Sequence, residues 1–256
     1  MSKIILKTEN LTKRYGAVQA LQGANFELRE GEHFAIVGDN GAGKSTFVRQ
    51  ITGVEQPSEG RIWFDGEEVA FEDPLEARER GMECVFQTLA LADDLDVPSN
   101  LFLGRELYKF RLGPFSFLDH AAMRRATEEG LKKTGVRIPS LDETIRHMSG
   151  GQRQCVAIAR AAMFASKLII MDEPTAALGV QETAQVEEII KTLKKNGVPL
   201  ILISHNLRQV FDLVDRIIVF RRGHISADLR KSETDGSDIV SYITGVRTQN
   251  PALEGI

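Results

Sequence analysis

Hydrophobic and polar residues alternate in short runs through the first part of the chain, a pattern that predicts β-strands. Such runs cover residues 4–8, 25–28 and 33–37. In the segment 60–69 the dipeptide Asp65-Gly66 separates two apolar-rich arms, as in a β-hairpin. We therefore expect an N-terminal region that is rich in antiparallel strands.

The spacing of apolar residues changes to that of helices from about residue 89 to residue 162. Within this stretch Asp119 suits the N-cap of a helix, and Gly135 suits its C-terminal stop. We therefore expect a helical segment inserted into a chain that otherwise contains strands.

Apolar strands return at residues 168–171 and 198–204, with a helical pattern between them that ends at Gly197. A strand, a helix and a strand in this order predict parallel pairing through a crossover helix. A further strand is expected at 217–220, and the segment after about residue 227 is polar and weakly patterned. These patterns together predict an α/β fold class.

The division into domains follows from the same change of pattern. Residues 1–88 and 163–256 are predicted to form a nucleotide-binding α/β core with an N-terminal β subdomain. Residues 89–162 are predicted to form the helical subdomain.

A glycine-rich loop follows the strand at 33–37, and its sequence GDNGAGKS fits the pattern G-x-x-x-x-G-K-[ST]. Backbone N–H groups of such a loop and of the following helix bind phosphate oxygens. Lys44 adds a positive charge between the β- and γ-phosphates, and the Ser45 hydroxyl supplies a ligand for Mg²⁺. The predicted ATP-binding residues here are Gly38, Asp39, Asn40, Gly41, Ala42, Gly43, Lys44, Ser45 and Thr46.

Two adjacent carboxylates, Asp172 and Glu173, follow the apolar strand at 168–171. Successive residues of a strand point to opposite sides, so the two groups can have different roles. We expect Asp172 to complete the Mg²⁺ shell and Glu173 to act as general base towards the attacking water.

A second anion site is predicted where Ser149, Gly150, Gly151 and Gln152 begin a helix. A serine N-cap followed by two glycines leaves the helix start open to an anion, although the same residues also form ordinary helix caps. Because the chain already has one phosphate loop, we interpret this site as contacting the nucleotide of a second copy.

In order and spacing, these motifs resemble the nucleotide-binding domains of ATP-binding-cassette (ABC) transporters over about residues 4–225. Residues 38–45 match the Walker A motif, 168–173 the Walker B motif, and 148–152 the LSGGQ signature. The resemblance implies a P-loop NTPase (RecA-like) core, an N-terminal antiparallel β subdomain and an inserted α-helical signature subdomain.

The resemblance also implies roles for three residues outside these motifs. Tyr15 matches the aromatic residue that stacks on adenine, Gln87 the glutamine that senses the γ-phosphate and Mg²⁺, and His205 the switch histidine. The implied catalytic residues are then Glu173, His205, Gln87 and Lys44, and the implied metal ligands are Ser45, Gln87 and Asp172.

Two positions depart from the family pattern. Met148 replaces the usual leucine of the signature, a change of similar volume that costs little. Gly179 stands where the family has an aspartate that contacts the opposing subunit. Glu173 is retained, so an active site is still expected.

Composition limits the classes of partner. The 256 residues carry a formal net charge of −4, which gives no basic excess for a nucleic acid, and no apolar run reaches the length of a membrane span. No signal peptide is expected, and Cys84 and Cys155 have neither metal-ligand nor CxxC spacing, so free thiols are predicted. The chain is expected at the cytoplasmic face of the inner membrane, as a peripheral protein.

The resemblance finally implies an ATPase that powers an importer. Two copies would close head-to-tail on ATP and Mg²⁺ and act on membrane permease subunits, with a periplasmic or extracellular substrate-binding protein as an indirect partner. Residues 92–106 are similar to the insertion of importers for ribose, galactose and fructose. A soluble non-transport ABC ATPase and a non-hydrolysing regulatory cassette remain as alternatives.

Overall fold

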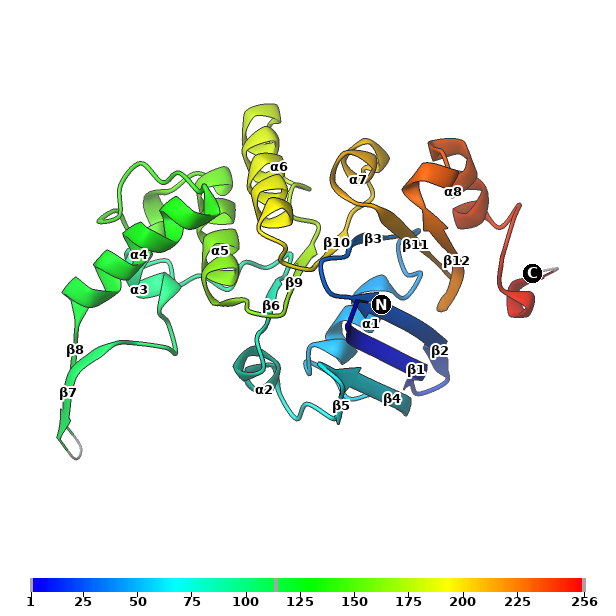
Figure 1. Ribbon diagram of the computed structural model, residues 1–256, viewed down its shortest axis with the longest axis horizontal. Coiled ribbons are helices and arrows are strands. Elements are labelled where there is room, and N and C mark those ends of the chain that lie inside the picture. The colour runs from blue at the N-terminus through cyan, green and yellow to red at the C-terminus, as the bar shows by residue number, and fades with distance from the viewer. Residues whose placement is uncertain (1, 113–114, 255–256) are drawn as a thin grey trace. The chain divides into compact units, whose positions relative to one another are not determined.

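The computed structural model describes residues 2–112 and 115–254, which divide into two compact units. The described parts of 1–84, 165–173 and 194–256 form one of them, called here the sheet unit. Residues 85–164 and 174–193 form the other, called the helical unit. Figure 1 labels the elements of both.

The N-terminal part of the sheet unit is an antiparallel sheet of four strands in the order β2-β1-β4-β5. The predicted hairpin is confirmed, because Asp65 (φ 55°) and Gly66 (φ 93°) form the turn between two paired strands. The first two strands are longer than predicted, since their mutual pairing includes polar residues that carry no apolar signal. The strands are β1 (Ile4–Tyr15), β2 (Val18–Arg29), β4 (Glu59–Phe64) and β5 (Glu67–Val69).

A second sheet of six strands has the order β12-β11-β3-β10-β9-β6 and forms the centre of the core. The predicted parallel pairing is confirmed, because β10 pairs in parallel with β3 and with β9, and β11 pairs in parallel with β3. The strands are β3 (His33–Val37), β6 (Met82–Val85), β9 (Leu168–Asp172), β10 (Leu200–Ile203), β11 (Arg216–Arg221) and β12 (His224–Arg230).

Helix α1 (Lys44–Ile51) joins the two sheets through aromatic packing. The ring of Phe47 lies 5.8 Å from Phe26 of β2 and 5.5 Å from Phe220 of β11, measured between centroids. All three side chains are at most 5% exposed. Burial of such rings contributes much of the hydrophobic stabilisation of a core, so the start of α1 rests on a rigid base.

The remaining helices of the sheet unit have side-chain caps. Asp73, Asn206 and Asp235 each accept a hydrogen bond from a backbone N–H in the first turn of the following helix. Helix α8 and the end of strand β12 lie after about residue 227, in the segment for which the sequence predicted no element. The helices are α2 (Pro74–Glu79), α7 (Leu207–Leu213) and α8 (Gly236–Thr244), with 3₁₀ turns at Lys231–Glu233 and Pro251–Leu253.

The helical unit is built around a small apolar core. Asp119 caps α4 by accepting from the N–H of Ala122, and Gly135 ends the helix at φ 72°, which confirms both predicted boundaries. The core residues are Val97, Leu101, Phe102, Met123, Ile145, Met148 and Val156. The helices are α3 (Val97–Leu101), α4 (His120–Thr134), α5 (Gly150–Phe164) and α6 (Val180–Lys195, up to Leu193 in this unit), with a 3₁₀ turn at Ile145–His147.

One part of the helical prediction is wrong. Strands β7 (Tyr108–Leu112) and β8 (Phe115–Leu118) pair as an antiparallel hairpin inside the segment that was expected to be helical. Phe110 and Phe117 lie opposite each other with ring centroids 5.0 Å apart, and such cross-strand aromatic pairs stabilise a hairpin.

Both cysteines are free, as predicted. Cys155 of α5 is buried, and Cys84 of β6 is of intermediate burial. Burial raises the pKa of both thiols, that of Cys155 to about 11.

Candidate functional site

The parallel strands bring three sequence segments to one edge of the central sheet. Ile203 of β10 pairs with Ile36 of β3 on one side and with Asp172 of β9 on the other. The carboxyl ends of these strands therefore lie at the same level, and the segments that leave them carry the glycine-rich loop, His205 and Glu173. Ligands of parallel α/β sheets bind at this edge.

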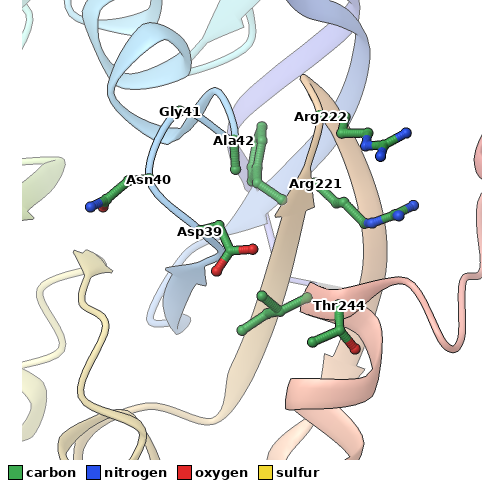
Figure 2. A pocket seen from close by; sticks show the side chains of 9 residues that line it. Asp39, Asn40, Gly41, Ala42, Arg221, Arg222 and Thr244 are labelled. Carbon is green, nitrogen blue, oxygen red and sulfur yellow. The ribbon is translucent and has the colours of Figure 1, made fainter. Parts of the chain in front are cut away.

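The glycine-rich loop is held closely against neighbouring backbone. A Cβ on Gly38 (φ 147°) would lie 2.3 Å from the carbonyl oxygen of Phe220, and one on Gly43 (φ 104°) would lie 2.8 Å from that of Ala20. The N–H of Gly223 donates to the carbonyl of Ala42 at 3.0 Å. Figure 2 shows the loop beside the end of β11 and the following turn. Glycine is required at 38 and 43 because strands β11 and β2 leave no room for a side chain.

Helix α1 begins without a side chain that would compete for an anion. Its N-cap is Gly43, which offers no side-chain hydrogen bond, and its first turn has no acidic residue. The Ser45 side chain is exposed at this end. The free N–H groups and the helix dipole therefore remain available to phosphate oxygens.

Lys44 folds back over the loop. Its Nζ donates to the carbonyl oxygens of Gly38 and Asp39 at 2.7 and 2.8 Å, and the residue is 9% exposed. Burial lowers the pKa of Lys44, and the carboxylates of Glu173 and Asp172 oppose this shift. The ammonium group thus donates to the loop carbonyls and interacts electrostatically with the two acids, and phosphate oxygens can replace the carbonyls as its acceptors.

The two acids have different environments. Asp172 has a raised pKa, first because of burial and then because of the neighbouring Glu173, while Lys44 and Arg49 oppose the rise. Glu173 adopts a left-handed backbone (φ 51°), and its N–H donates to the carbonyl of Ile203 at 3.0 Å. A left-handed non-glycine residue costs about 1–2 kcal/mol, which indicates that the surrounding structure fixes the direction of this side chain.

Glu173 and His205 form a pair. The Nδ1 of His205 lies 2.8 Å from Oε2 of Glu173, whose side chain is 18% exposed, whereas that of His205 is 70% exposed. The pairing holds one oxygen of the Glu173 carboxylate, and the side chain remains partly exposed to water. This arrangement suits a general base.

Residues at this edge fit a magnesium ion. Ser45 offers a hydroxyl oxygen and Asp172 a carboxylate oxygen, the hard ligands that Mg²⁺ prefers, with the other positions left to water and phosphate. The raised pKa of Asp172 shows that its negative charge is costly here, and a divalent cation offsets that cost. Within the described ranges no group of three or more His, Cys, Asp or Glu side chains could by itself hold a metal.

Tyr15 lies near the start of α1. Its hydroxyl pairs with the carboxylate of Glu55, and the Lys13 ammonium is 5.4 Å from the ring centroid. Burial and then Glu55 raise the pKa of Tyr15, while a hydrogen bond with Thr46 lowers it. The ring is 43% exposed, so it retains surface on which a base could stack. The role of Glu55 was not predicted from the sequence, because no local pattern relates it to Tyr15, which lies 40 positions earlier.

The signature segment and Gln87 belong to the helical unit, whereas Lys44, Asp172, Glu173 and His205 all belong to the sheet unit. The N–H of Ser149 donates to Oε1 of Gln152 at 2.8 Å, and the N–H of Gln152 donates to Oγ of Ser149 at 3.2 Å. This reciprocal capping box fixes the start of α5. Gln87 is exposed just after β6, and Met148 is 5% exposed in the core of the helical unit.

A separate cavity of about 290 Å³ adjoins the glycine-rich loop (Figure 2). Lys44, Ser45, Asp172 and Glu173 do not line it, so it is distinct from the cluster of charged residues described above. Its lining consists of Asp39, Asn40, Gly41, Ala42, Phe220, Arg221, Arg222, Ile243 and Thr244.

Across the described residues, no helix combines the length and the apolar character needed to cross a membrane.

Comparison with known sequences supports one family. The sequence model of the family described as ABC transporter matches residues 21–176. The fructose import ATP-binding protein FrcA of Rhizobium meliloti is 44% identical, over 98% of this chain and 97% of that protein. The xylose/arabinose import ATP-binding protein XylG of Sulfolobus acidocaldarius is 41% identical, over 94% of each. The ribose import ATP-binding protein RbsA of Bacillus subtilis is 37% identical, and the match covers 48% of its length.

Solved structures confirm the fold. A dimeric ATP-binding cassette in a post-hydrolysis state, bound to ADP and Pi, has a TM-score of 0.75 and 26% identity over 89% of this chain and 99% of that one. An ATP-binding cassette of an ABC transporter in its ADP conformation has a TM-score of 0.77 and 28% identity over 98% and 96%. The predicted α/β P-loop fold is therefore confirmed.

Proposed function

The chain belongs to the ABC transporter family, and from this premise we propose that it is the ATP-hydrolysing subunit of an importer for a monosaccharide. One observation carries the catalytic part of the proposal. Lys44, Asp172 and Glu173 interact at one edge of the parallel sheet, and His205 pairs with Glu173 there. A cation, a metal ligand and an oriented base are the groups that phosphoryl transfer requires.

In the proposed reaction the Lys44 ammonium and the N–H groups at the start of α1 bind the β- and γ-phosphates. Mg²⁺ held by Ser45 and Asp172 would neutralise charge on the same phosphates. Glu173 accepts a proton from a water whose oxygen forms a bond to the γ-phosphorus, and the bond from that phosphorus to the bridging oxygen breaks. ADP and phosphate leave, and His205 holds the Glu173 carboxylate in line throughout.

The second copy completes the site in this proposal. Residues 149–152 of one chain would bind the γ-phosphate held by the other, because the capping box uses only the N–H groups of Ser149 and Gln152 and the positive end of the helix dipole at the start of α5 favours an anion. Gln87, at the beginning of the helical unit, would respond to the γ-phosphate and Mg²⁺. The predicted signature subdomain, residues 89–162, would pass the resulting motion to a permease. A solved cassette with the same fold is dimeric, which supports the pairing.

Sugar import and localisation rest on the relatives. Three of them are named as import ATP-binding proteins for fructose, xylose/arabinose and ribose. By this proposal the chain binds the cytoplasmic face of a membrane through permease subunits, and a substrate-binding protein delivers the sugar to them.

The test measures ATP hydrolysis by the purified chain and by Lys44→Ala, first alone and then in membranes with a candidate permease and sugar-binding protein. We expect Mg²⁺-dependent hydrolysis that Lys44→Ala abolishes and that fructose, ribose or xylose increases in the membranes. Hydrolysis without any response to sugar would favour a non-transport ATPase. ATP binding without hydrolysis in both settings would favour a regulatory cassette.

A further inference from the structure

The side chain of Glu182 covers two glycines from different parts of the helical unit. A Cβ on Gly151, in the first turn of α5, would lie 2.2 Å from Cγ and 2.8 Å from Cβ of Glu182. A Cβ on Gly179, just before α6, would lie 2.6 Å from its Oε2. The stem of Glu182 therefore occupies the space beside Gly151, and its carboxylate occupies the space beside Gly179.

Neither glycine is required by its own backbone. Both lie outside the left-handed region that excludes ordinary side chains. Contact with the stem of Glu182 is therefore what opposes a larger residue at position 151, whereas at position 179 only the flexible carboxylate end of Glu182 lies close.

Helix capping explains only part of this arrangement. Glu182 lies in the first turn of α6, where a carboxylate interacts favourably with the N-terminal end of the helix. That role would account for a carboxylate near Gly179 but not for a stem packed on α5. A second observation also places Glu182 towards α5, because its charge adds to burial in raising the pKa of Cys155.

We propose that Glu182 is a positioning residue that couples the two ATP sites of the dimer, an inference that rests on the proposed function. The chain runs from Glu173, the base of its own site, through a short turn to Gly179. Hydrogen bonds from the N–H of Leu178 to the carbonyl of Thr175, and from that of Thr183 to the carbonyl of Gly179, stiffen this turn.

Glu182 connects the end of that turn to Gly151, which belongs to the segment that serves the other site. Displacement of the turn, when the γ-phosphate beside Glu173 is lost, is transmitted by direct contact to the start of α5. The position of the signature segment then depends on whether its own chain holds ATP or ADP. Because this segment binds the nucleotide of the other chain, hydrolysis at one site changes the affinity or rate at the other.

The test measures the rate of hydrolysis against ATP concentration, together with binding of a fluorescent ATP analogue, for the unchanged chain, Glu182→Ala and Glu182→Gln. We expect Glu182→Ala to reduce the Hill coefficient from near 2 to about 1 and kcat by roughly tenfold, with analogue binding unchanged. Glu182→Gln keeps the shape of the side chain and should retain both. Glu188→Ala on the same helix is the matched control, because Glu188 is exposed and pairs with Lys191.

A second substitution tests the contact itself. Gly151→Ala brings a Cβ to 2.2 Å from Cγ and 2.8 Å from Cβ of Glu182, and Glu182→Ala removes the closer of these two atoms. The loss of kcat caused by Gly151→Ala should therefore be several-fold smaller in the Glu182→Ala background than in the unchanged chain.

Three results would overturn the inference. One is a Glu182→Ala variant with an unchanged Hill coefficient and kcat. Another is an equal loss in Glu182→Ala and Glu182→Gln that follows melting temperature alone, as a purely structural role predicts. If the unchanged chain hydrolyses no ATP, the proposed function fails and the inference fails with it, which distinguishes that case from the other two.

Discussion

Replacement of Gly38 by alanine tests how the nucleotide loop is held. The Cβ would lie 2.3 Å from the carbonyl oxygen of Phe220, a backbone atom that cannot rotate away. Gly41, in the same loop, provides the matched control. It also has a positive φ (78°), but nothing lies within 4 Å of its Cβ position.

The two substitutions should differ by the cost of the contact. Gly41→Ala carries only backbone strain, about 1–2 kcal/mol. Gly38→Ala combines strain at φ 147° with overpacking against β11, together about 2–6 kcal/mol. With about 2–4 °C per kcal/mol for a chain of this size, Gly38→Ala should melt several degrees below Gly41→Ala.

The assay is thermal unfolding of the nucleotide-free protein, with ATP affinity measured on the same samples. We expect Gly38→Ala to lose most ATP binding, because the loop must move away from β11 and its N–H groups no longer converge on the phosphates. Equal melting temperatures and equal ATP affinities for the two variants would refute the claim that contact with Phe220 shapes the loop.

Substitutions at three further positions separate roles at the site. Burial raises the pKa of Asp172 in the folded protein above its ordinary 3.8. The ionised form therefore lowers the free energy of unfolding at neutral pH, and this cost disappears below pH 3.8, where Asp172 is protonated in the folded and the unfolded state. Asp172→Asn should therefore end hydrolysis and yet have a higher melting temperature than the unchanged chain at pH 7. The difference in melting temperature should shrink as the pH falls through the raised pKa of Asp172. A lower melting temperature of the variant at pH 7 would contradict this. Tyr15→Ala should weaken ATP binding by about tenfold and Tyr15→Phe hardly at all, because stacking on the base needs the ring. Equal ATP affinities of Tyr15→Ala and the unchanged chain, measured by titration, would exclude stacking. His205→Ala should abolish hydrolysis but change the free energy of unfolding by less than about 1 kcal/mol, because the side chain is 70% exposed. A large drop in melting temperature would show a structural role instead.

The parts of the site that the sequence predicts well are continuous in the chain. The strand at 33–37 is buried throughout, so its apolar run has no exposed positions that would blur the pattern. The loop after it uses adjacent residues, whose order alone determines which N–H groups and which ammonium can meet at a phosphate. Asp172 and Glu173 likewise follow directly from the end of a buried strand.

Contacts between distant residues could not be predicted from one sequence. Glu55 beside Tyr15 and Glu182 beside Gly151 are ordinary surface acids in the sequence, and only the fold brings them to their partners. The requirement for glycine at position 38 is similar. The motif gives its identity, but the carbonyl of Phe220 that enforces it lies on a strand far along the chain.

The hairpin β7–β8 shows why local periodicity fails. Its apolar residues, Phe110 and Phe117 among them, occur within a stretch whose overall spacing suits helices. They form a strand pair in which the two rings meet across the paired strands, an interaction that a one-dimensional pattern does not contain. Helix α8 was not predicted either. Of its residues only Ile239 is buried, so the helix has no buried apolar face to produce a helical pattern.

The central claim is that Glu173 is the base of an ATP-hydrolysing site completed by a second copy of the chain. Its most direct test is a single-turnover measurement on Glu173→Gln with ATP and Mg²⁺, combined with the mass of the complex in solution. We predict that the variant binds ATP, doubles in mass and forms no ADP, while the unchanged chain hydrolyses ATP under the same conditions. Hydrolysis by Glu173→Gln at a rate near that of the unchanged chain would contradict the account.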